Sequence, residues 1–311
     1  MEDFELTLFD RLEMIRSVLQ DISPDECYIS FSGGKDSTVL HYLIDEAIPN
    51  NEYERVFCDT GIEYNDIRNF VNEFVEKDKR FRIIRPNENI KKFLESDGYP
   101  FKSKRHAKMV RSYQHSIQDG RPVYPYVQKY IDPENESHFR CPKSLRYQFS
   151  EDFELRVSHK CCDKLKKQPF HKYEKETGRT LRITGVRKEE GGLRAIHLSG
   201  GCVFKDKNGK IYQFTPLGPV SDEFVDWYIE TRNIQLAKLY YPPFNFDRTG
   251  CKGCGFNRHL DKELMILEEN LPNENRQCWA IWRPLYEEYQ RIHYRGLHKI
   301  KDPFKNERDE E

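Results

Sequence analysis

The sequence predicts an α/β fold with a doubly wound, mostly parallel sheet, and three observations lead to it. Short β-branched and aromatic runs alternate with segments of helical periodicity through the first 97 residues. The first run leads directly into Ser-Gly-Gly-Lys-Asp-Ser at residues 32–37, and the second ends in Asp59-Thr60-Gly61. In a parallel sheet such turns lie at the carboxyl ends of the strands, where α/β proteins bind their ligands.

Apolar spacing defines the N-terminal elements. Leu8, Leu12, Ile15 and Leu19 lie at helical intervals and predict a helix over residues 4–22 with one buried stripe. The elements expected after it are a strand that enters the turn at residue 32, a helix over 36–47, a strand over 55–58, a helix through 67–74, a strand over 81–84 and a short helix over 90–94.

The turn at residues 32–37 has the composition of a phosphate-binding loop. Glycine lets backbone N–H groups approach an oxyanion, the start of a helix offers unpaired N–H groups and a positive dipole end, and Lys35 adds a cation. The loop is not of the GxxxxGK[ST] kind, because Lys35 directly follows Gly34. A tight strand-to-helix turn with a solvated lysine is the alternative interpretation.

The regular alternation stops after residue 97. Several prolines interrupt a polar, tyrosine-rich stretch, which predicts an insertion or lid with short helices over residues 98–142. We therefore expect a nucleotide-binding α/β domain over 1–97 and 143–235, and a C-terminal CxxC and helical region over 236–311.

The later elements follow from the same patterns. Ser221 is expected to cap a helix that contains Trp227, and residues 205–210 to form a hairpin-like turn. The other elements expected are a helix over 143–167, strands over 180–186 and 211–214, helices over 262–270 and 276–294, and a frayed acidic tail over 307–311.

The charge balance is even overall but uneven along the chain. There are 51 basic and 52 acidic residues, yet residues 99–172 hold sixteen Lys or Arg against eight Asp or Glu. This segment is interpreted either as a face for a polyanion such as tRNA or DNA, or as a solvated face around a nucleotide pocket. The acidic N-terminus and the absence of a long apolar run predict a cytoplasmic protein without a membrane segment, in which the nine cysteines are thiols or metal ligands.

Two cysteine motifs suggest a metal centre. Cys161-Cys162 are adjacent, and Cys251 and Cys254 form a CxxC turn. Adjacent thiolates ligate one zinc ion only in a strained geometry, whereas a four-iron cluster presents separate iron atoms, so a [4Fe–4S] cluster suits the set better than zinc. A zinc knuckle or buried free thiols remain the alternatives.

The other cysteines divide into two groups. Cys27 and Cys58 lie in predicted strands and are expected in the core. Cys141, Cys202 and Cys278 are ambiguous: Cys278 lies on an apolar helix face, which favours packing, whereas Cys141, beside Pro142, could be exposed enough to react.

A third motif follows a predicted strand. Thr184-Gly185-Val186-Arg187 with Arg194 places two arginines seven residues apart, where their guanidinium groups could bind a phosphate or sulfate. Solvated charges at a strand end would look much the same.

Together these motifs resemble the phosphoadenylylsulfate (PAPS) reductase family of the PP-loop adenine nucleotide α-hydrolase superfamily. The cysteine motifs look like the signature of its iron–sulfur branch, which includes adenylylsulfate reductases. The resemblance implies catalytic roles for Lys35, Asp36 and Arg187 and a cluster on the four cysteines named above. It implies nucleotide binding by Ser30, Ser32, Gly33, Gly34, Lys35, Asp36, Ser37, Asp59, Thr60, Gly61, Gly185, Arg187 and Arg194.

One departure from the family decides between functions. Its reductases use a cysteine in a C-terminal Glu-Cys-Gly-Leu-His motif, whereas this chain has Arg295-Gly296-Leu297-His298 and no cysteine after Cys278. We therefore expect an enzyme of sulfur metabolism that binds ATP or a related, adenylylsulfate-type nucleotide and cleaves it between the α and β phosphates with Mg²⁺. This transferase would couple adenylylation to sulfur transfer from a donor or partner protein. The alternatives are a reductase that uses Cys141, Cys278 or a partner's thiol, and a non-catalytic nucleotide- and cluster-binding subunit.

Overall fold

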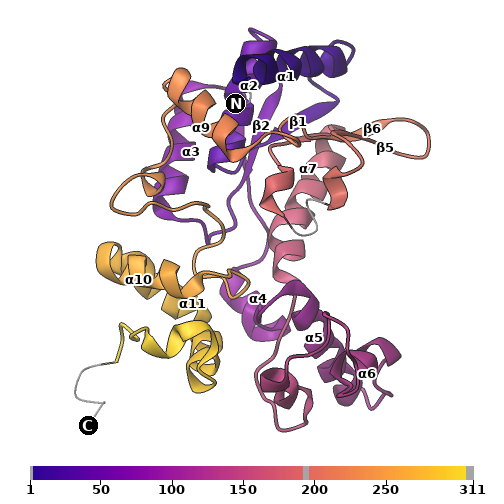
Figure 1. The fold of residues 1–311 in the computed structure, drawn as a ribbon, viewed down its shortest axis with the longest axis vertical. Coiled ribbons are helices and arrows are strands. Elements are labelled where there is room, and N and C mark those ends of the chain that lie inside the picture. Colours follow the sequence, from indigo (N-terminus) through magenta and orange to yellow (C-terminus); the bar gives the residue numbers. More distant parts are fainter. Residues whose placement is uncertain (1–2, 192–195, 306–311) are drawn as a thin grey trace. The chain divides into compact units, whose positions relative to one another are not determined.

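The computed structural model describes residues 3–191 and 196–305 (Figure 1). By its internal contacts the chain divides into unit 1, residues 1–86 and 168–249, and unit 2, residues 87–167 and 250–311. The three-part division expected from the sequence, with boundaries at residues 98, 143 and 236, stays a proposal.

Unit 1 contains a six-stranded sheet in the order β3-β2-β1-β4-β6-β5. All neighbours in this sheet pair in parallel except β5 and β6, which form an antiparallel hairpin. The strands are β1 (Cys27–Ser30), β2 (Glu54–Cys58), β3 (Phe81–Ile84), β4 (Leu181–Thr184), β5 (Val203–Lys205) and β6 (Ile211–Phe214). The prediction of an α/β fold with a mostly parallel sheet is confirmed.

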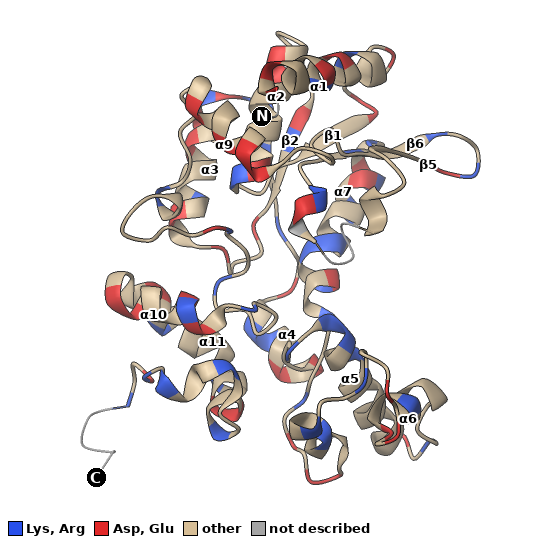
Figure 2. Cartoon of the chain, viewed as in Figure 1, with Lys and Arg blue, Asp and Glu red and all other residues tan. Residues whose placement is uncertain are grey.

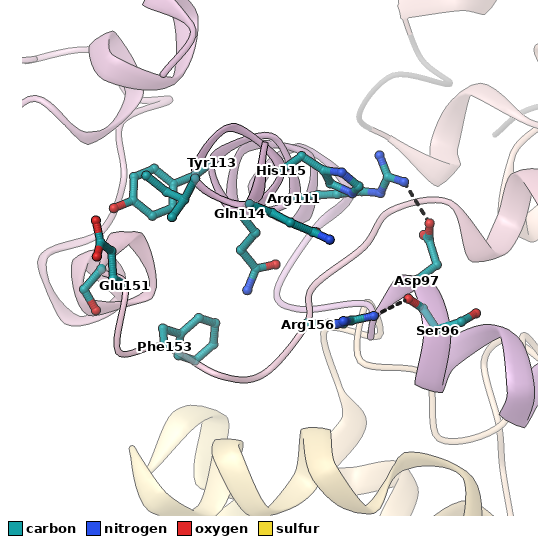
Figure 3. Close-up of a pocket in the computed structure, with 12 residues that line it drawn as sticks. Ser96, Asp97, Arg111, Tyr113, Gln114, His115, Glu151, Phe153 and Arg156 are labelled. Carbon is teal, nitrogen blue, oxygen red and sulfur yellow. Dashed lines mark hydrogen bonds and ion pairs between the residues drawn. The ribbon is translucent and has the colours of Figure 1, made fainter. Parts of the chain in front are cut away.

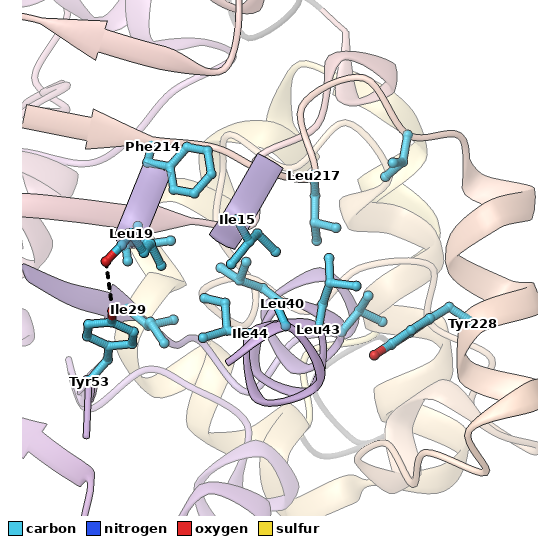
Figure 4. Close-up of a cluster of buried hydrophobic side chains, with 14 of the residues drawn as sticks. Ile15, Leu19, Ile29, Leu40, Leu43, Ile44, Tyr53, Phe214, Leu217 and Tyr228 are labelled. Atoms are coloured by element: carbon cyan, nitrogen blue, oxygen red, sulfur yellow. Dashed lines mark hydrogen bonds between the residues drawn. The ribbon is translucent and has the colours of Figure 1, made fainter. Parts of the chain in front are cut away.

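Helices pack on both faces of this sheet because the strand side chains alternate. Cys27 and Ile29 of β1 belong to a large apolar cluster with α1, α2 and α9, part of which Figure 4 shows. Tyr28, between them in the strand, packs instead against Tyr173 of α7. The helices of unit 1 are α1 (Phe4–Leu19), α2 (Lys35–Ala47), α3 (Asn65–Lys77), α7 (Gln168–Thr177) and α9 (Asp222–Thr231), with short 3₁₀ turns η3 (Lys188–Glu190) and η4 (Lys238–Tyr240). The Ser221 hydroxyl caps α9 by accepting a hydrogen bond from the Phe224 N–H, as predicted.

Unit 2 is helical. Its elements are α4 (Ile90–Asp97), α5 (Lys104–Gln118), α6 (Pro125–Ile131), η1 (Lys143–Phe149), the π-helical η2 (Asp163–Lys167), α10 (Leu260–Asn270), α11 (Pro272–Arg291) and η5 (Tyr294–Lys299). The predicted tail at 307–311 lies outside the described residues.

Two predictions for this unit were wrong. The stretch after residue 97 was expected to contain only short helices, but α5 has 15 residues. The helix expected over 143–167 is interrupted between η1 and residue 161. The reason is a tertiary pairing, because the Tyr99 N–H donates to the Arg156 carbonyl and the Ser158 N–H donates to the Tyr99 carbonyl.

Two general properties follow from the described residues. None of their helices is long and apolar enough to cross a membrane. All nine cysteines are free thiols in this structure.

Candidate nucleotide and metal sites

The predicted phosphate loop lies at the point where the strand order of the sheet reverses. From β1 the chain adds β2 and β3 on one side, whereas β4, β6 and β5 lie on the other. Ligands of open α/β sheets bind outside the carboxyl ends of the strands at such a switch point. Residues 32–34, which follow β1, and Gly185, which follows β4, both lie there.

Two glycines allow the backbone to pack closely around this loop. Gly33 has φ +71°, and a Cβ atom there would lie 2.9 Å from methyl groups of Ile67 and Val71. A Cβ atom on Gly185 would lie 2.8 Å from the Asp36 carbonyl oxygen, which is rigid backbone in the first turn of α2. Glycine at 185 therefore lets the end of β4 contact the start of α2.

Side-chain hydroxyls hold the loop in shape. The Ser32 N–H donates to the Ser37 Oγ at 3.1 Å, and the two serine hydroxyls lie 3.0 Å apart. The Gly34 N–H donates to the Ser32 Oγ at 3.3 Å. Gly34 is the N-cap of α2 and supplies no side-chain cap, so the start of this helix remains suited to an anion.

A tyrosine from a distant segment contacts the start of α2. The Lys35 N–H donates to the Tyr240 hydroxyl at 3.0 Å, and this hydroxyl is 2.8 Å from the Thr249 hydroxyl. The Lys35 ammonium group donates to Asp226 of α9 at 3.0 Å. Tyr240, Thr249 and Asp226 were missed from the sequence because no local pattern connects them with the loop.

Arg187 is buried among carboxylates. Its guanidinium donates to Asp36 at 2.8 Å and also to Asp222, and it lies 3.6 Å from Glu189. Burial lowers the pKa of this group, but Asp222 and Asp36 outweigh that effect and raise it. Arg187 thus fixes the orientation of Asp36, while its predicted catalytic and anion-binding roles stay predictions.

The Asp59-Thr60-Gly61 turn follows the neighbouring strand β2. Asp59 is buried, accepts a hydrogen bond from the Gly61 N–H and forms ion pairs with Arg68 and Arg85. The Thr60 hydroxyl donates to the buried Glu63 carboxylate at 2.7 Å. The turn is therefore rigid. Ser30 ends β1, and Arg194 lies outside the described residues.

In unit 2, α11 fastens the CxxC turn through three aromatic side chains. Trp282 donates its indole N–H to the Lys252 carbonyl at 3.0 Å, Tyr286 donates to the Gly253 carbonyl at 2.6 Å, and Tyr289 donates to the Gly255 carbonyl at 2.9 Å. These donors lie at positions i, i+4 and i+7, which form one face of a helix. The helix was predicted, but its role in holding the CxxC turn was not.

The same turn contains a buried charge pair. Lys252 lies between the two cysteines of the motif and is 2% exposed. Its ammonium group donates to Glu274 and Gln277 of α11. Burying an ammonium group is costly unless polar partners compensate for the lost water, so Glu274 and Gln277 together permit this position.

All four cysteines of the predicted metal centre belong to unit 2 and influence one another. The hydrogen bond between Cys161 and Cys162 raises the pKa of Cys161 and lowers that of Cys162, and nearby Cys254 and Cys251 raise the pKa of Cys161 further. Burial raises the pKa of Cys254. Even so, no group of three or more His, Cys, Asp or Glu side chains in the described part of the chain is arranged to hold a metal ion.

The remaining cysteines are mostly buried. Cys27 and Cys58 lie in the core, as predicted. Cys141, which was ambiguous from the sequence and a candidate for an exposed thiol, is 1% exposed, and burial raises its pKa to about 11. Cys278 is fully buried against the CxxC turn, and burial raises its pKa well above the ordinary value.

Three solved structures that are similar to this chain have low sequence identity to it. A PAPS reductase from Candida auris, solved as a phosphate complex, is 14% identical, with 73% of this chain and 88% of that one covered and a TM-score of 0.39. The U34-tRNA thiolase NcsA from Methanococcus maripaludis, solved with its [4Fe–4S] cluster, is 15% identical, with 96% and 82% covered and a TM-score of 0.40. An FMN adenylyltransferase from Candida glabrata is 14% identical, with 77% and 60% covered and a TM-score of 0.40.

Sequence comparison gives the assignment. An uncharacterized protein, MJ0973, from Methanocaldococcus jannaschii is 34% identical over 101 residues, which are 32% of this chain and 22% of that protein. The chain therefore matches about a fifth of that relative's length. The phosphoadenosine phosphosulfate reductase domain matches residues 26–130 and 133–255, well over half of the chain. The chain belongs to the phosphoadenosine phosphosulfate reductase domain family.

Proposed function

We propose that this protein binds ATP at the Ser32–Ser37 loop and transfers the adenylyl group to an acceptor oxygen, which sulfur then replaces. The observation that carries the proposal is the serine-lined loop at the switch point of the sheet, followed by the start of α2, whose N-cap Gly34 has no side chain to occupy the helix end. An anion at this position meets backbone N–H groups and the positive end of the helix dipole.

The proposed reaction has two steps, adenylylation of the acceptor oxygen and its replacement by sulfur. The acceptor oxygen attacks the α-phosphorus, the α–β phosphoanhydride bond breaks and pyrophosphate leaves. A sulfide-type nucleophile from the donor then attacks the acceptor carbon, and AMP leaves with the oxygen. Neither step requires an oxidant or reductant, because sulfur enters and remains at the sulfide level.

Side chains around the loop have roles that fit this reaction. Lys35 would stabilise negative charge on the phosphates once it exchanges Asp226 for the ligand. Asp36, which Arg187 orients, would help to place a Mg²⁺ ion or a water molecule. Asp36 is the candidate residue to hold Mg²⁺, which would supply positive charge to stabilise the leaving pyrophosphate.

The cysteine set fits a [4Fe–4S] cluster by its donor chemistry. Four thiols lie in one unit, close enough for three of them to shift the pKa of Cys161. Such a cluster, when bound to Cys161, Cys162, Cys251 and Cys254, would tune the electrostatics around these residues. The part of this chain is to hold the CxxC backbone, which the aromatic donors of α11 already do.

The reductase alternative is weaker for a specific reason. Its candidate nucleophiles are Cys141 and Cys278, and both are buried thiols with raised pKa values. A thiolate is the attacking species, so burial disfavours both. A partner's thiol would rescue this alternative, and a subunit that binds nucleotide without turnover is the third possibility.

One anaerobic experiment separates these functions. Purified protein is incubated in parallel with ATP, adenylylsulfate and PAPS, and pyrophosphate and sulfite are measured. We expect pyrophosphate from ATP only. Thiol-dependent sulfite release would favour the reductase, and nucleotide binding without either product would favour the non-catalytic subunit.

Metal analysis on the same samples tests the cluster. We expect about four irons per chain, with loss of iron in Cys251→Ser. Cys202→Ser is the matched control because Cys202 is a half-buried thiol of unit 1 outside the set. One zinc per chain and no iron would overturn the cluster.

A further inference from the structure

A cavity in unit 2 has the lining of a site for a base and its phosphate. Its volume is about 270 Å³, and α4, α5 and the stretch from residue 150 to 156 enclose it (Figure 3). Drug-sized ligands occupy cavities of roughly 300–1,000 Å³, so this one suits a single ring system. None of the reactions described above uses it.

One end of the cavity has two aromatic rings beside the Glu151 carboxylate. Tyr113 of α5 and Phe153 both line it and lie on the same side of the close-up (Figure 3). Each ring is held by a second ring: Phe149 packs edge-on to Tyr113 with centroids 5.6 Å apart, and Tyr147 packs edge-on to Phe153 at 5.4 Å. Rings fixed in this way can stack with a base at little cost in conformational entropy.

The other end is polar and carries two arginines. Arg111 pairs with Asp97 at 2.8 Å, which leaves that end close to neutral. Arg156 adds a positive charge, because its guanidinium donates to the Ser96 carbonyl at 2.9 Å and no carboxylate among the described residues pairs with it. Arg156 is exposed at the rim, where a phosphate could reach it.

Hydrogen bonds hold the wall of the cavity against α5. The Gln114 amide donates to the Leu155 carbonyl at 2.8 Å and accepts from the Val157 N–H at 3.1 Å. A glutamine that satisfies both backbone groups of an extended stretch fixes that stretch in place. The cavity is therefore preformed.

A basic stripe on α5 leads to the cavity. Lys104, Lys108, Arg111 and His115 lie at i, i+4, i+7 and i+11, the spacing of one helix face, and Figure 2 shows basic residues on and beside α5. Lys108 also lies 5.9 Å from the ring of Tyr126, which stacks with Tyr124. Both tyrosines are more than 40% exposed. Exposed aromatic rings beside a basic stripe are the features of a surface for single-stranded nucleic acid.

We propose that this cavity binds one unpaired nucleotide of a single-stranded nucleic acid, with its base at Tyr113 and Phe153 and its phosphate at Arg156, while the α5 stripe binds the adjoining backbone. This inference deepens the proposed function by naming single-stranded nucleic acid as the acceptor. It rests on the proposed function only for the claim that the bound nucleic acid is then modified. The binding itself requires no turnover.

The test is fluorescence anisotropy with labelled 12-nucleotide single strands of RNA and of DNA, and with the same sequences as duplexes. Phe153→Leu keeps an apolar side chain but loses stacking, so its Kd for the single strand should rise about 5-fold to 100-fold. Arg156→Ala and Lys108→Ala should each weaken binding and lower the salt slope of log K by roughly 0.7. The RNA and DNA arms identify the source of the nucleotide.

Lys262→Ala is the matched control because Lys262 is exposed on α10 of the same unit, away from the stripe. It should leave affinity and salt slope unchanged, and all variants should keep the thermal midpoint of the wild type. Equal affinity for Phe153→Leu and the wild type, an Arg156→Ala effect no larger than that of Lys262→Ala, or a preference for duplexes would overturn the proposal. Retained single-strand binding without pyrophosphate release would instead count against the proposed function alone.

Discussion

At each candidate site, one tyrosine hydroxyl forms hydrogen bonds with two other residues. In unit 1, Tyr240 accepts the Lys35 N–H at 3.0 Å and contacts the Thr249 hydroxyl. In unit 2, Tyr289 accepts the Lys102 N–H at 2.8 Å and donates to the Gly255 carbonyl at 2.9 Å. Both sites are thus fastened by the same chemical group.

The lysines of the two sites differ in their surroundings. The Lys35 side chain is 22% exposed, and its partner Asp226 is 64% exposed. The Lys252 side chain is 2% exposed, and its partner Glu274 is 7% exposed. An open pair can exchange its carboxylate for a ligand, whereas a buried pair cannot separate without exposing a charge to the protein interior. We infer that Lys35 serves binding and that Lys252 serves structure.

The largest effect is expected from Lys252→Ala, which would remove the ammonium partner of the buried Glu274 carboxylate. Breaking a buried pair in this way costs about 3–5 kcal/mol, so the free energy of unfolding should fall by that amount in denaturant titrations. The double variant Lys252→Met with Glu274→Leu removes both charges and should recover most of the loss. If Lys252→Ala lowered the free energy of unfolding by less than about 1 kcal/mol, as expected for a surface ion pair, the claim that Lys252 and Lys35 have different roles would be wrong.

A smaller effect, on binding, is expected from Lys35→Ala. Loss of a charge-assisted contact should weaken ATP binding by about 1.5–3 kcal/mol, measured by isothermal titration calorimetry. The free energy of unfolding should change by less than about 1 kcal/mol, because the pair with Asp226 is solvent-exposed. Lys77→Ala on α3 is the control, since its side chain is 76% exposed. Unchanged ATP affinity would remove Lys35 from the nucleotide site.

Local patterns in the sequence were sufficient to predict the loop at residues 32–37 and the strands around it. Strand, glycine turn and helix start are adjacent in the chain at residues 28–40, and their φ and hydrogen-bond requirements act over a few residues. The same holds for the Ser221 cap of α9. The family assignment followed from the order of such motifs.

The supports of both sites could not be predicted, because they act between residues far apart in the chain. Tyr240 is 205 residues from Lys35, and Tyr289 is 187 residues from Lys102. The interrupted helix over 143–167 has the same origin, since pairing with Tyr99 overrides the local preference of residues 156–158. The burial of Cys141 could not be decided from its position beside Pro142 in the predicted insertion, and the fold buries it.

The smallest expected effect is the difference in the free energy of unfolding between the variants Tyr289→Phe and Tyr240→Phe. Removing the Tyr289 hydroxyl leaves the Lys102 N–H and the Gly255 carbonyl without their partner inside unit 2, where Tyr289 is fully buried. Such unsatisfied buried groups cost about 1–3 kcal/mol, whereas loss of a hydrogen bond near solvent costs about 0.5–1.5 kcal/mol. Tyr240 is only half-buried, so Tyr240→Phe should destabilise less than Tyr289→Phe in denaturant titrations. Both variants lose the same oxygen atom and keep the same ring, so any difference in destabilisation comes from the surroundings of the hydroxyl. If Tyr240→Phe destabilised the protein more than Tyr289→Phe, burial would not be what distinguishes the two hydroxyls.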